Sequence, residues 1–190
     1  MTDYFALLGV SRRPWIDDEE LKAKYHAQTL QHHPDTASAN TGGFVEINEA
    51  YQTLRDPKRR LQHLLTLENS AADRNAAAIP PQIQELFPRV SETTHRGEAV
   101  LTKARATSNA LARGLLQAEL LRAQSDIRQV LEKLTQLSDE ALRELRELDK
   151  TWANHQGADL AAAHRVQLTL SYLGRWSAQL QEKQFQLSLC

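Results

Sequence analysis

The stretch LKAKYHAQTLQHHPD (residues 21–35), together with FVEINEAYQTL (residues 44–54), decides the fold of the first part of the chain. Apolar side chains recur every three or four residues in both runs, which predicts two amphipathic helices. Pro34 has no backbone N–H and disfavours a helical conformation for the preceding residue, so the first helix must end there. A polar loop over residues 36–43 joins the runs. The sequence therefore predicts a helical hairpin that presents His33-Pro34-Asp35 to solvent at its turn.

Capping signals frame the hairpin with further short helices. A helix over Asp3–Leu8 is expected to end at Gly9, which tolerates a positive φ. Asp17 is a suitable N-cap for the first long helix. Asp56 is a suitable N-cap for a third helix with proline at its first position, and that helix carries three leucines, Leu61, Leu64 and Leu65.

The second part of the chain has a different pattern, which predicts an antiparallel bundle of about three helices. We expect a first domain over residues 1–67, a linker rich in small and polar residues over 68–81, and the bundle over 82–190. Two positions compete for the first turn of the bundle, one near Gly114 and one at Ser138-Asp139. Pro88 is expected to break the helix around it, and Gly157 is expected to end a helix. Trp152 and Trp176 are expected to pack against other residues rather than bind a ligand. The predicted fold class is all-α.

Composition excludes several classes of function. The net charge is −1, so no global positive field would attract nucleic acid or an anionic membrane. Cys190 is the only cysteine, which excludes an internal disulfide and a cysteine-based zinc site and fits a reducing compartment. Neither a signal-peptide pattern nor an apolar run of membrane-spanning length is present. We therefore expect a cytoplasmic protein.

The residues give little support to catalysis or metal binding. His26, His32 and His33 are close in sequence, but no carboxylate or cysteine at ligand spacing completes a metal site. A dyad of His33 and Asp35 lacks a nucleophile and a pocket. We expect no catalytic residue, no metal and no cofactor, and hence a protein that is not an enzyme.

The motifs of the first part resemble the J-domain of DnaJ-type co-chaperones. The resemblance rests on Asp3-Tyr4-Phe5, Leu7-Leu8-Gly9-Val10, Leu21-x-x-x-Tyr25, His33-Pro34-Asp35, Ile47-Asn48-Glu49-Ala50-Tyr51-x-x-Leu54-x-Asp56-Pro57 and Arg59-Arg60. It implies docking on the ATPase domain of a DnaK/HscA-type chaperone, whose ATP hydrolysis it would speed. It further implies that the docking residues are His33, Pro34, Asp35, Lys22, Tyr25 and His26.

The chain departs from the J-domain pattern in its charge. J-domains often place four or more basic residues on the helix before the tripeptide, and here that helix has only Lys22 and Lys24. Thr36 stands where lysine or arginine is usual. Because surface charge mainly sets encounter rate and salt sensitivity, we expect transient docking that depends little on salt.

A helical second part follows the first directly, without a Gly/Phe-rich segment or zinc motifs. The chain also contains Leu54-Arg55-x-Pro57-x-x-Arg60-x-x-x-Leu64-Leu65 and Leu170-x-Tyr172-Leu173-x-Arg175. This arrangement and these motifs resemble HscB, the J-domain co-chaperone of iron–sulfur cluster assembly. The resemblance implies delivery of an IscU-type cluster scaffold to the chaperone.

The segment with which HscB proteins bind the scaffold has a poorer counterpart in this chain than the motifs above. Its nearest counterpart, residues 83–92, implies contacts by Leu86, Phe87 and Glu92, with Leu173 or the adjacent Tyr172 on the last helix. Packing in a core or linker is the competing interpretation of these residues. A different client, or a helical domain that self-associates into an oligomer, also fits the sequence.

Overall fold

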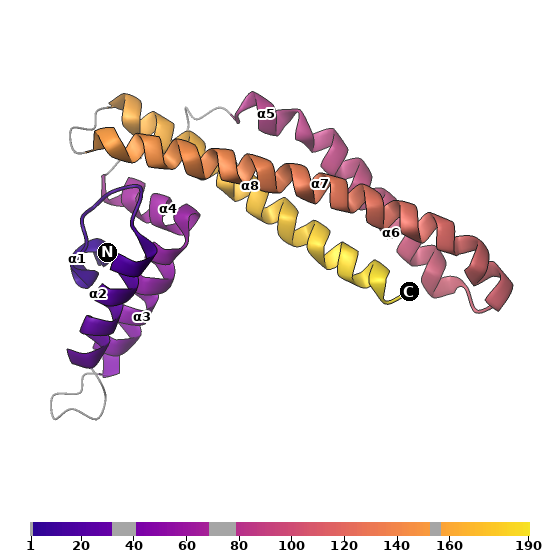
Figure 1. Cartoon of the computed structure of the whole chain (residues 1–190), viewed down its shortest axis with the longest axis horizontal. Helices are drawn as coiled ribbons and strands as arrows, with labels where there is room; N and C mark the ends of the chain where they lie inside the picture. Colours follow the sequence, from indigo (N-terminus) through magenta and orange to yellow (C-terminus); the bar gives the residue numbers. More distant parts are fainter. Residues whose placement is uncertain (1, 32–40, 69–78, 153–156) are drawn as a thin grey trace. The chain divides into compact units, whose positions relative to one another are not determined.

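The computed structural model describes residues 2–31, 41–68, 79–152 and 157–190, and every regular element within these ranges is a helix (Figure 1). The predicted all-α class is confirmed. Contacts divide the chain into two compact units. The first unit comprises Met1–Ala78 and Leu142–Gln167, and the second comprises Ile79–Ala141 and Leu168–Cys190. His33, Pro34 and Asp35 lie outside the described residues.

The first unit is built on α1 (Tyr4–Leu8), α2 (Asp18–Gln31), α3 (Thr41–Arg55) and α4 (Pro57–Leu67). The caps predicted at Gly9, Asp17 and Asp56 are confirmed, and the structure adds one at Asp3. Oδ1 of Asp3 accepts hydrogen bonds from the backbone N–H groups of Phe5 and Ala6 at 3.0 and 3.3 Å. Gly9 ends α1 with φ 64° and ψ 39°. Carboxylates in the same role begin α2 and α4, from Asp17 and Asp56 respectively.

The predicted hairpin is formed by α2 and α3, which pack against each other and against α1. Tyr25 of α2 stacks on Tyr51 of α3 with ring centroids 4.2 Å apart. Leu21 and Ile47 are almost fully buried on the facing sides of the two helices. Burying these apolar stripes stabilises the hairpin, because each large aliphatic side chain contributes about 1.5–3 kcal/mol on transfer from water.

A buried arginine joins three segments of the first unit. Arg60 of α4 is 1% exposed. Its Nε donates to the carbonyl oxygen of Pro14 at 2.8 Å, and its Nη1 donates to the carbonyl oxygen of Leu54 at 2.7 Å. Burial lowers the pKa of Arg60 to about 10, so the guanidinium remains charged at neutral pH. Arg60 thereby fixes the end of α3 and the connector before α2 onto α4.

The connector between α1 and α2 is also held by the end of α7 (Ala110–Thr151), which belongs to the first unit from Leu142 onward. Asp149 accepts hydrogen bonds from Nε of Arg13 at 2.9 Å and from the backbone N–H of Trp15 at 3.1 Å. The guanidinium of Arg146 lies over the Trp15 ring, 4.2 Å from its centroid. An ion pair, a backbone hydrogen bond and a cation–π contact thus converge on the connector.

His63 of α4 closes the other side of the first unit. Its Nε2 accepts a hydrogen bond from the backbone N–H of Tyr4 at 3.1 Å, and its ring stacks on that of Tyr4 with centroids 4.5 Å apart. The side chain is buried, and this burial lowers the pKa of His63. A protonated Nε2 has no lone pair for the Tyr4 N–H, so the geometry also favours the neutral ring.

Acidification should therefore destabilise the first unit. The unfolded imidazole, with a pKa of about 6.5, binds a proton more readily than the folded one. Stabilisation from His63 is present above about pH 6.5 and is lost as the pH falls below that value. We expect urea unfolding to show a larger loss of stability between about pH 7.5 and pH 5.5 for the wild type than for His63→Gln. His95→Gln, at an exposed position of α6, is the control, and an unchanged pH dependence in His63→Gln would contradict the assignment.

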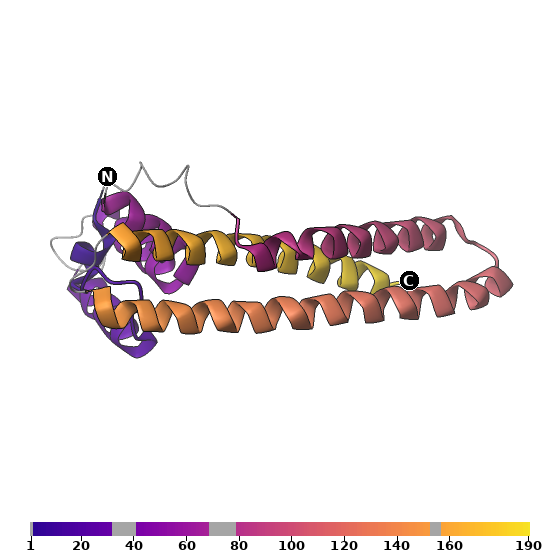
Figure 2. The ribbon, with the colours of Figure 1, turned by 90° about the horizontal axis from the view of Figure 1, so that it is seen from above.

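The second unit is a bundle of α6 (Leu86–Ala106), the first part of α7 and the last part of α8 (Gly157–Ser188), preceded by the single turn α5 (Pro81–Gln84). Figures 1 and 2 show α6 antiparallel to the first part of α7, with the last part of α8 beside them. Polar contacts also link the helices at their edges. The core contains Ile83, Leu86, Val90, Val100, Leu101, Leu116, Leu120, Ala123, Ile127, Val130, Leu134, Leu137, Leu173, Trp176, Leu180 and Leu187.

One glycine marks the close approach of α6 to α8. A Cβ atom at Gly97 would lie 3.1 Å from Cγ of Lys183 and 3.5 Å from Cδ1 of Ile127. The Lys183 stem crosses this gap, and its ammonium group pairs with Glu98. A larger residue at position 97 would push the lysine stem away from α6.

The first turn of the bundle lies at neither of the expected positions. It falls at Thr107–Asn109, where Oδ1 of Asn109 accepts from the backbone N–H of Leu111 at 2.9 Å and so caps α7. Helix α7 runs through Gly114 without interruption. It also runs through Ser138, whose hydroxyl donates to the carbonyl oxygen of Leu134 at 2.9 Å instead of capping a new helix.

Two other predicted helix breaks were wrong. Pro88 lies in the first turn of α6, where backbone N–H groups have no partner within the helix, so the proline removes no hydrogen bond. Gly157 begins α8 rather than ending α7, which ends at Thr151. The packing role predicted for Trp152 and Trp176 is confirmed, since they are 3% and 6% exposed.

Candidate functional site

The first candidate surface is the exposed side of α2. Lys22 and His26 are exposed, and Tyr25 is half-buried against Tyr51. The Lys22 ammonium lies 2.6 Å from Oε1 of Glu19, and this hydrogen bond raises the pKa of Lys22. The three residues lie within about one turn of α2, so a partner can contact Lys22 and His26 together while Tyr25 anchors the helix to α3.

The charge of α2 is close to balanced. Its first turn carries three acids, Asp18, Glu19 and Glu20, and its two lysines follow. Acids at a helix N-terminus are stabilised by the partial positive charge there. They also offset the lysines, so the helix has no strongly positive field with which to attract an acidic partner over long distances.

The second candidate surface belongs to the second unit and is aromatic. Phe87 of α6 is 38% exposed. Its ring meets those of Tyr172 and Trp176 of α8 edge-on, with centroid distances of 5.3 and 4.9 Å. The Arg175 guanidinium lies 5.7 Å from the Tyr172 centroid. We call Phe87, Tyr172 and Trp176 the aromatic cluster; it offers a partner an apolar patch beside a cation.

The four scaffold-contact residues expected from the sequence occupy different environments. Phe87 and Glu92 are exposed, and Glu92 pairs with Arg96 at 2.6 Å. Leu86 and Leu173 are 8% and 0% exposed and form part of the core. In this structure the two leucines hold α6 against α8 and so position the aromatic cluster, whereas Phe87 and Glu92 are open to a partner.

Within the part of the chain that the structure describes, no group of three or more histidine, cysteine, aspartate or glutamate side chains is arranged to hold a metal ion. Among the same residues, no helix combines the length and apolar content needed to cross a membrane.

The sequence of the first part of the chain matches known proteins. The family model described as DnaJ domain matches residues 3–63. The chaperone protein DnaJ of Caulobacter vibrioides is 43% identical over 63 residues, which are 32% of this chain and 16% of that protein. The co-chaperone protein HscB of Proteus mirabilis is 36% identical over 74 residues, which are 35% of this chain and 43% of that protein.

Solved structures resemble the fold along nearly the whole chain. The chaperone HscB from Vibrio cholerae aligns over 98% of this chain and 99% of its own, with a TM-score of 0.53 and 21% identity. The human co-chaperone protein HscB aligns over 96% and 82%, with a TM-score of 0.55 and 16% identity. Residues 3–63 of this chain match a DnaJ domain, and the chain as a whole has the fold of HscB.

The DnaJ domain contains every docking residue expected from the sequence, because residues 3–63 extend from the cap of α1 into α4. The aromatic cluster lies beyond residue 63, outside the part of the chain that matches the DnaJ domain. The chain spans about a sixth of the DnaJ relative and less than half of the HscB relative by sequence.

Sequence reasoning assigned no role to Trp15 or Asp149, which meet in the first unit although they are 134 positions apart. No local pattern signals such a pairing. Trp176 was expected only to pack, yet it also forms one side of the aromatic cluster. Its spacing of one helical turn from Tyr172 was the available signal.

Proposed function

We propose that this DnaJ-domain protein is a co-chaperone that stimulates ATP hydrolysis by a DnaK/HscA-type chaperone and delivers an IscU-type iron–sulfur cluster scaffold to it in the cytoplasm. The observation that carries the proposal is the DnaJ-domain match over residues 3–63, which includes His33-Pro34-Asp35 between two helices that pack side by side. In this role the chain performs no chemistry, because the nucleotide is bound and hydrolysed by its partner.

The DnaJ domain and the second unit have separate tasks in this proposal. His33, Pro34 and Asp35 act on the chaperone, with Lys22, Tyr25 and His26 on the adjoining helix. Phe87, with Glu92 five residues further along α6, contacts the scaffold. Large aromatic side chains that are partly open to solvent provide most of the affinity in many protein interfaces, which supports the choice of Phe87.

Single-turnover ATPase assays test the proposal. The full chain is added to an HscA-type or a DnaK-type chaperone, with and without the scaffold. Stimulation of the HscA-type chaperone that rises further when the scaffold is present supports both parts. Stimulation that does not change when the scaffold is added would support the proposed action on the chaperone. It would contradict delivery of the scaffold and indicate a different client.

Salt should have little effect on the stimulation. Because the charges of α2 nearly balance, we expect the stimulated rate to fall by less than about tenfold between about 50 and 200 mM salt. The assay is a titration of the chain into a fixed amount of chaperone at several salt concentrations, corrected for the unstimulated rate. A fall of about a hundredfold would show that long-range attraction controls docking after all.

Truncating Phe87 should weaken scaffold binding. We expect Phe87→Ala to raise the Kd for the scaffold about tenfold or more, since partly exposed aromatic anchors contribute about 1–3 kcal/mol to an interface. Leu121→Ala, at an exposed apolar position of α7, is the matched control for loss of surface area. Calorimetry would measure both, and an equal affinity of Phe87→Ala and the wild type would remove the aromatic cluster from the interface.

A further inference from the structure

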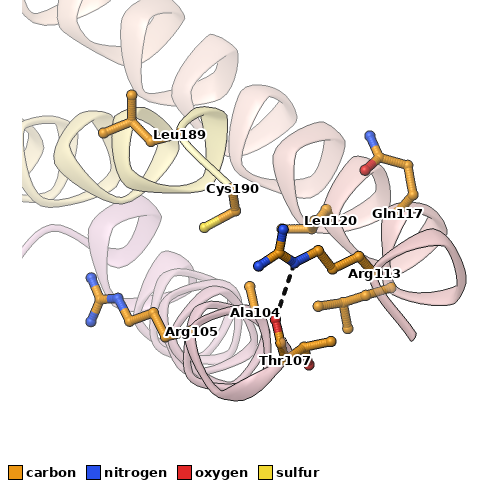
Figure 3. A pocket seen from close by; sticks show the side chains of 9 residues that line it. Ala104, Arg105, Thr107, Arg113, Gln117, Leu120, Leu189 and Cys190 are labelled. Atoms are coloured by element: carbon orange, nitrogen blue, oxygen red, sulfur yellow. Dashed lines mark hydrogen bonds between the residues drawn. The ribbon is translucent and has the colours of Figure 1, made fainter. Parts of the chain in front are cut away.

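A pocket of about 360 Å³ lies at the end of the second unit where α6 is followed by α7 (Figure 3). This volume is within the range of small-molecule sites in proteins, about 300–1,000 Å³. The pocket is lined by α6, the turn after it, the start of α7 and the last residues of the chain. None of its lining residues belongs to the docking surface of α2 or to the aromatic cluster.

One wall of the pocket is apolar. Leu116 and Leu120 lie one turn apart on α7 and are 8% and 5% exposed. Ala104 of α6 extends this wall, and Leu189, which is 71% exposed, adds an aliphatic side chain at the rim. An alkyl chain placed against these residues would leave water and cover the exposed side of Leu189.

Arg113 provides a fixed cation at the pocket. Its Nε donates to the carbonyl oxygen of Thr107 at 3.1 Å, which is the bond drawn in Figure 3. This anchor uses one donor and leaves the two terminal nitrogens of the guanidinium for a ligand. A planar guanidinium held in this way matches the two oxygens of a carboxylate.

Arg105 provides a second cation. It forms no hydrogen bond or ion pair with the described residues; its charge acts on Glu98 only through space. Among the described residues that line the pocket, none has an acidic side chain. A neighbouring pocket of about 390 Å³ contrasts with it, since its two arginines are balanced by Glu119 and Asp126. The pocket in Figure 3 therefore combines an apolar wall with two arginine side chains and no acidic side chain.

We propose that this pocket binds a small carboxylate that carries an apolar chain. The carboxylate accepts hydrogen bonds from the terminal nitrogens of Arg113. Arg105, which extends from the other side of α6 in Figure 3, adds positive charge at the rim. The chain lies against Leu116 and Leu120. The site is independent of the co-chaperone function proposed above, because it shares no residue with either partner surface.

Octanoate is the probe for the test, titrated into the full chain and followed by amide NMR shifts. We expect saturable shifts centred on residues 104–120. Acetate keeps the charge without the chain, and octanol keeps the chain without the charge. Each should bind about tenfold more weakly or worse, since a charged hydrogen bond or a buried alkyl chain contributes at least that factor.

Charge-removing variants locate the site. Arg113→Gln should raise the Kd for octanoate about tenfold, and Arg105→Gln should raise it by a smaller factor, because its charge acts without a direct bond. Arg128→Gln, at an exposed position elsewhere on α7, should leave the Kd unchanged. Arg105→Gln gives up no bond within the chain, so its effect is not a folding defect. The proposal is overturned if octanoate gives no saturable shifts, if octanol binds as tightly, or if both pocket variants keep the wild-type affinity.

Discussion

Replacing His33 by glutamine should abolish stimulation of the chaperone's ATPase while leaving the chain folded. The expected loss is about 30-fold or more, the effect of removing a contact worth about 2 kcal/mol at the centre of an interface. His33 follows the last described turn of α2, which ends at Gln31, and precedes a proline that cannot continue a helix. We therefore expect its imidazole to be exposed, so that glutamine costs the DnaJ domain little stability.

The assay is single-turnover hydrolysis at saturating co-chaperone, combined with thermal unfolding of each variant. His95→Gln makes the same substitution at an exposed position of α6 and should stimulate as the wild type does. Asp35→Asn should reduce stimulation in the same direction, because it removes the neighbouring charge. If His33→Gln stimulates as well as the wild type, the tripeptide is only a helix stop and the proposed chaperone docking fails.

The second large effect is on stability. We expect Arg60→Ala to lower the free energy of unfolding by about 3 kcal/mol, because two hydrogen bonds from a charged donor are lost and the carbonyl oxygens of Pro14 and Leu54 are left buried. Burying the charged guanidinium itself costs free energy, as the lowered pKa of Arg60 indicates, and this cost offsets part of the loss. Alanine, however, cannot donate hydrogen bonds to the two buried carbonyl oxygens.

Arg59→Ala is the matched control, since this neighbouring arginine is exposed and its guanidinium bonds, among the described residues, only to Gln52 and Thr53. Its loss should change the stability by less than about 1 kcal/mol. Arg60→Lys should also be destabilising, because a single ammonium cannot reproduce the two directed bonds of the guanidinium. Urea unfolding would measure all three, and similar stabilities for Arg60→Ala and Arg59→Ala would show that the buried arginine is not a structural anchor.

The helix starts that were predicted correctly have causes within a few residues of sequence. Asp17 and Asp56 each accept from backbone N–H groups two or three positions ahead, so the residue type and its place are sufficient. The breaks that were predicted wrongly involve signals worth about 1 kcal/mol, such as a glycine inside a helix. Burial of the leucines along α7 outweighs a signal of that size at Gly114 and Ser138.

At the candidate surfaces, too, part of the result was predicted from the sequence and part was decided only by packing. The sequence pointed to Phe87 and Leu173 together, but only packing decided that Leu173 is enclosed and Phe87 is partly open. Apolar residues on one helical stripe look alike in sequence, and their exposure depends on how much of the stripe the neighbouring helix covers.

The sequence by itself determined the all-α class, the aspartate caps at Asp17 and Asp56, and the helical pairing around the tripeptide, because periodicity and capping act over one or two turns. Only the tertiary structure decided that Asp149 accepts hydrogen bonds from Arg13 and from the backbone N–H of Trp15. It also decided that two arginines lie beside an apolar pocket after α6. These groups are far apart along the chain, and whether they meet depends on the path of helices whose local patterns carry no information about their partners.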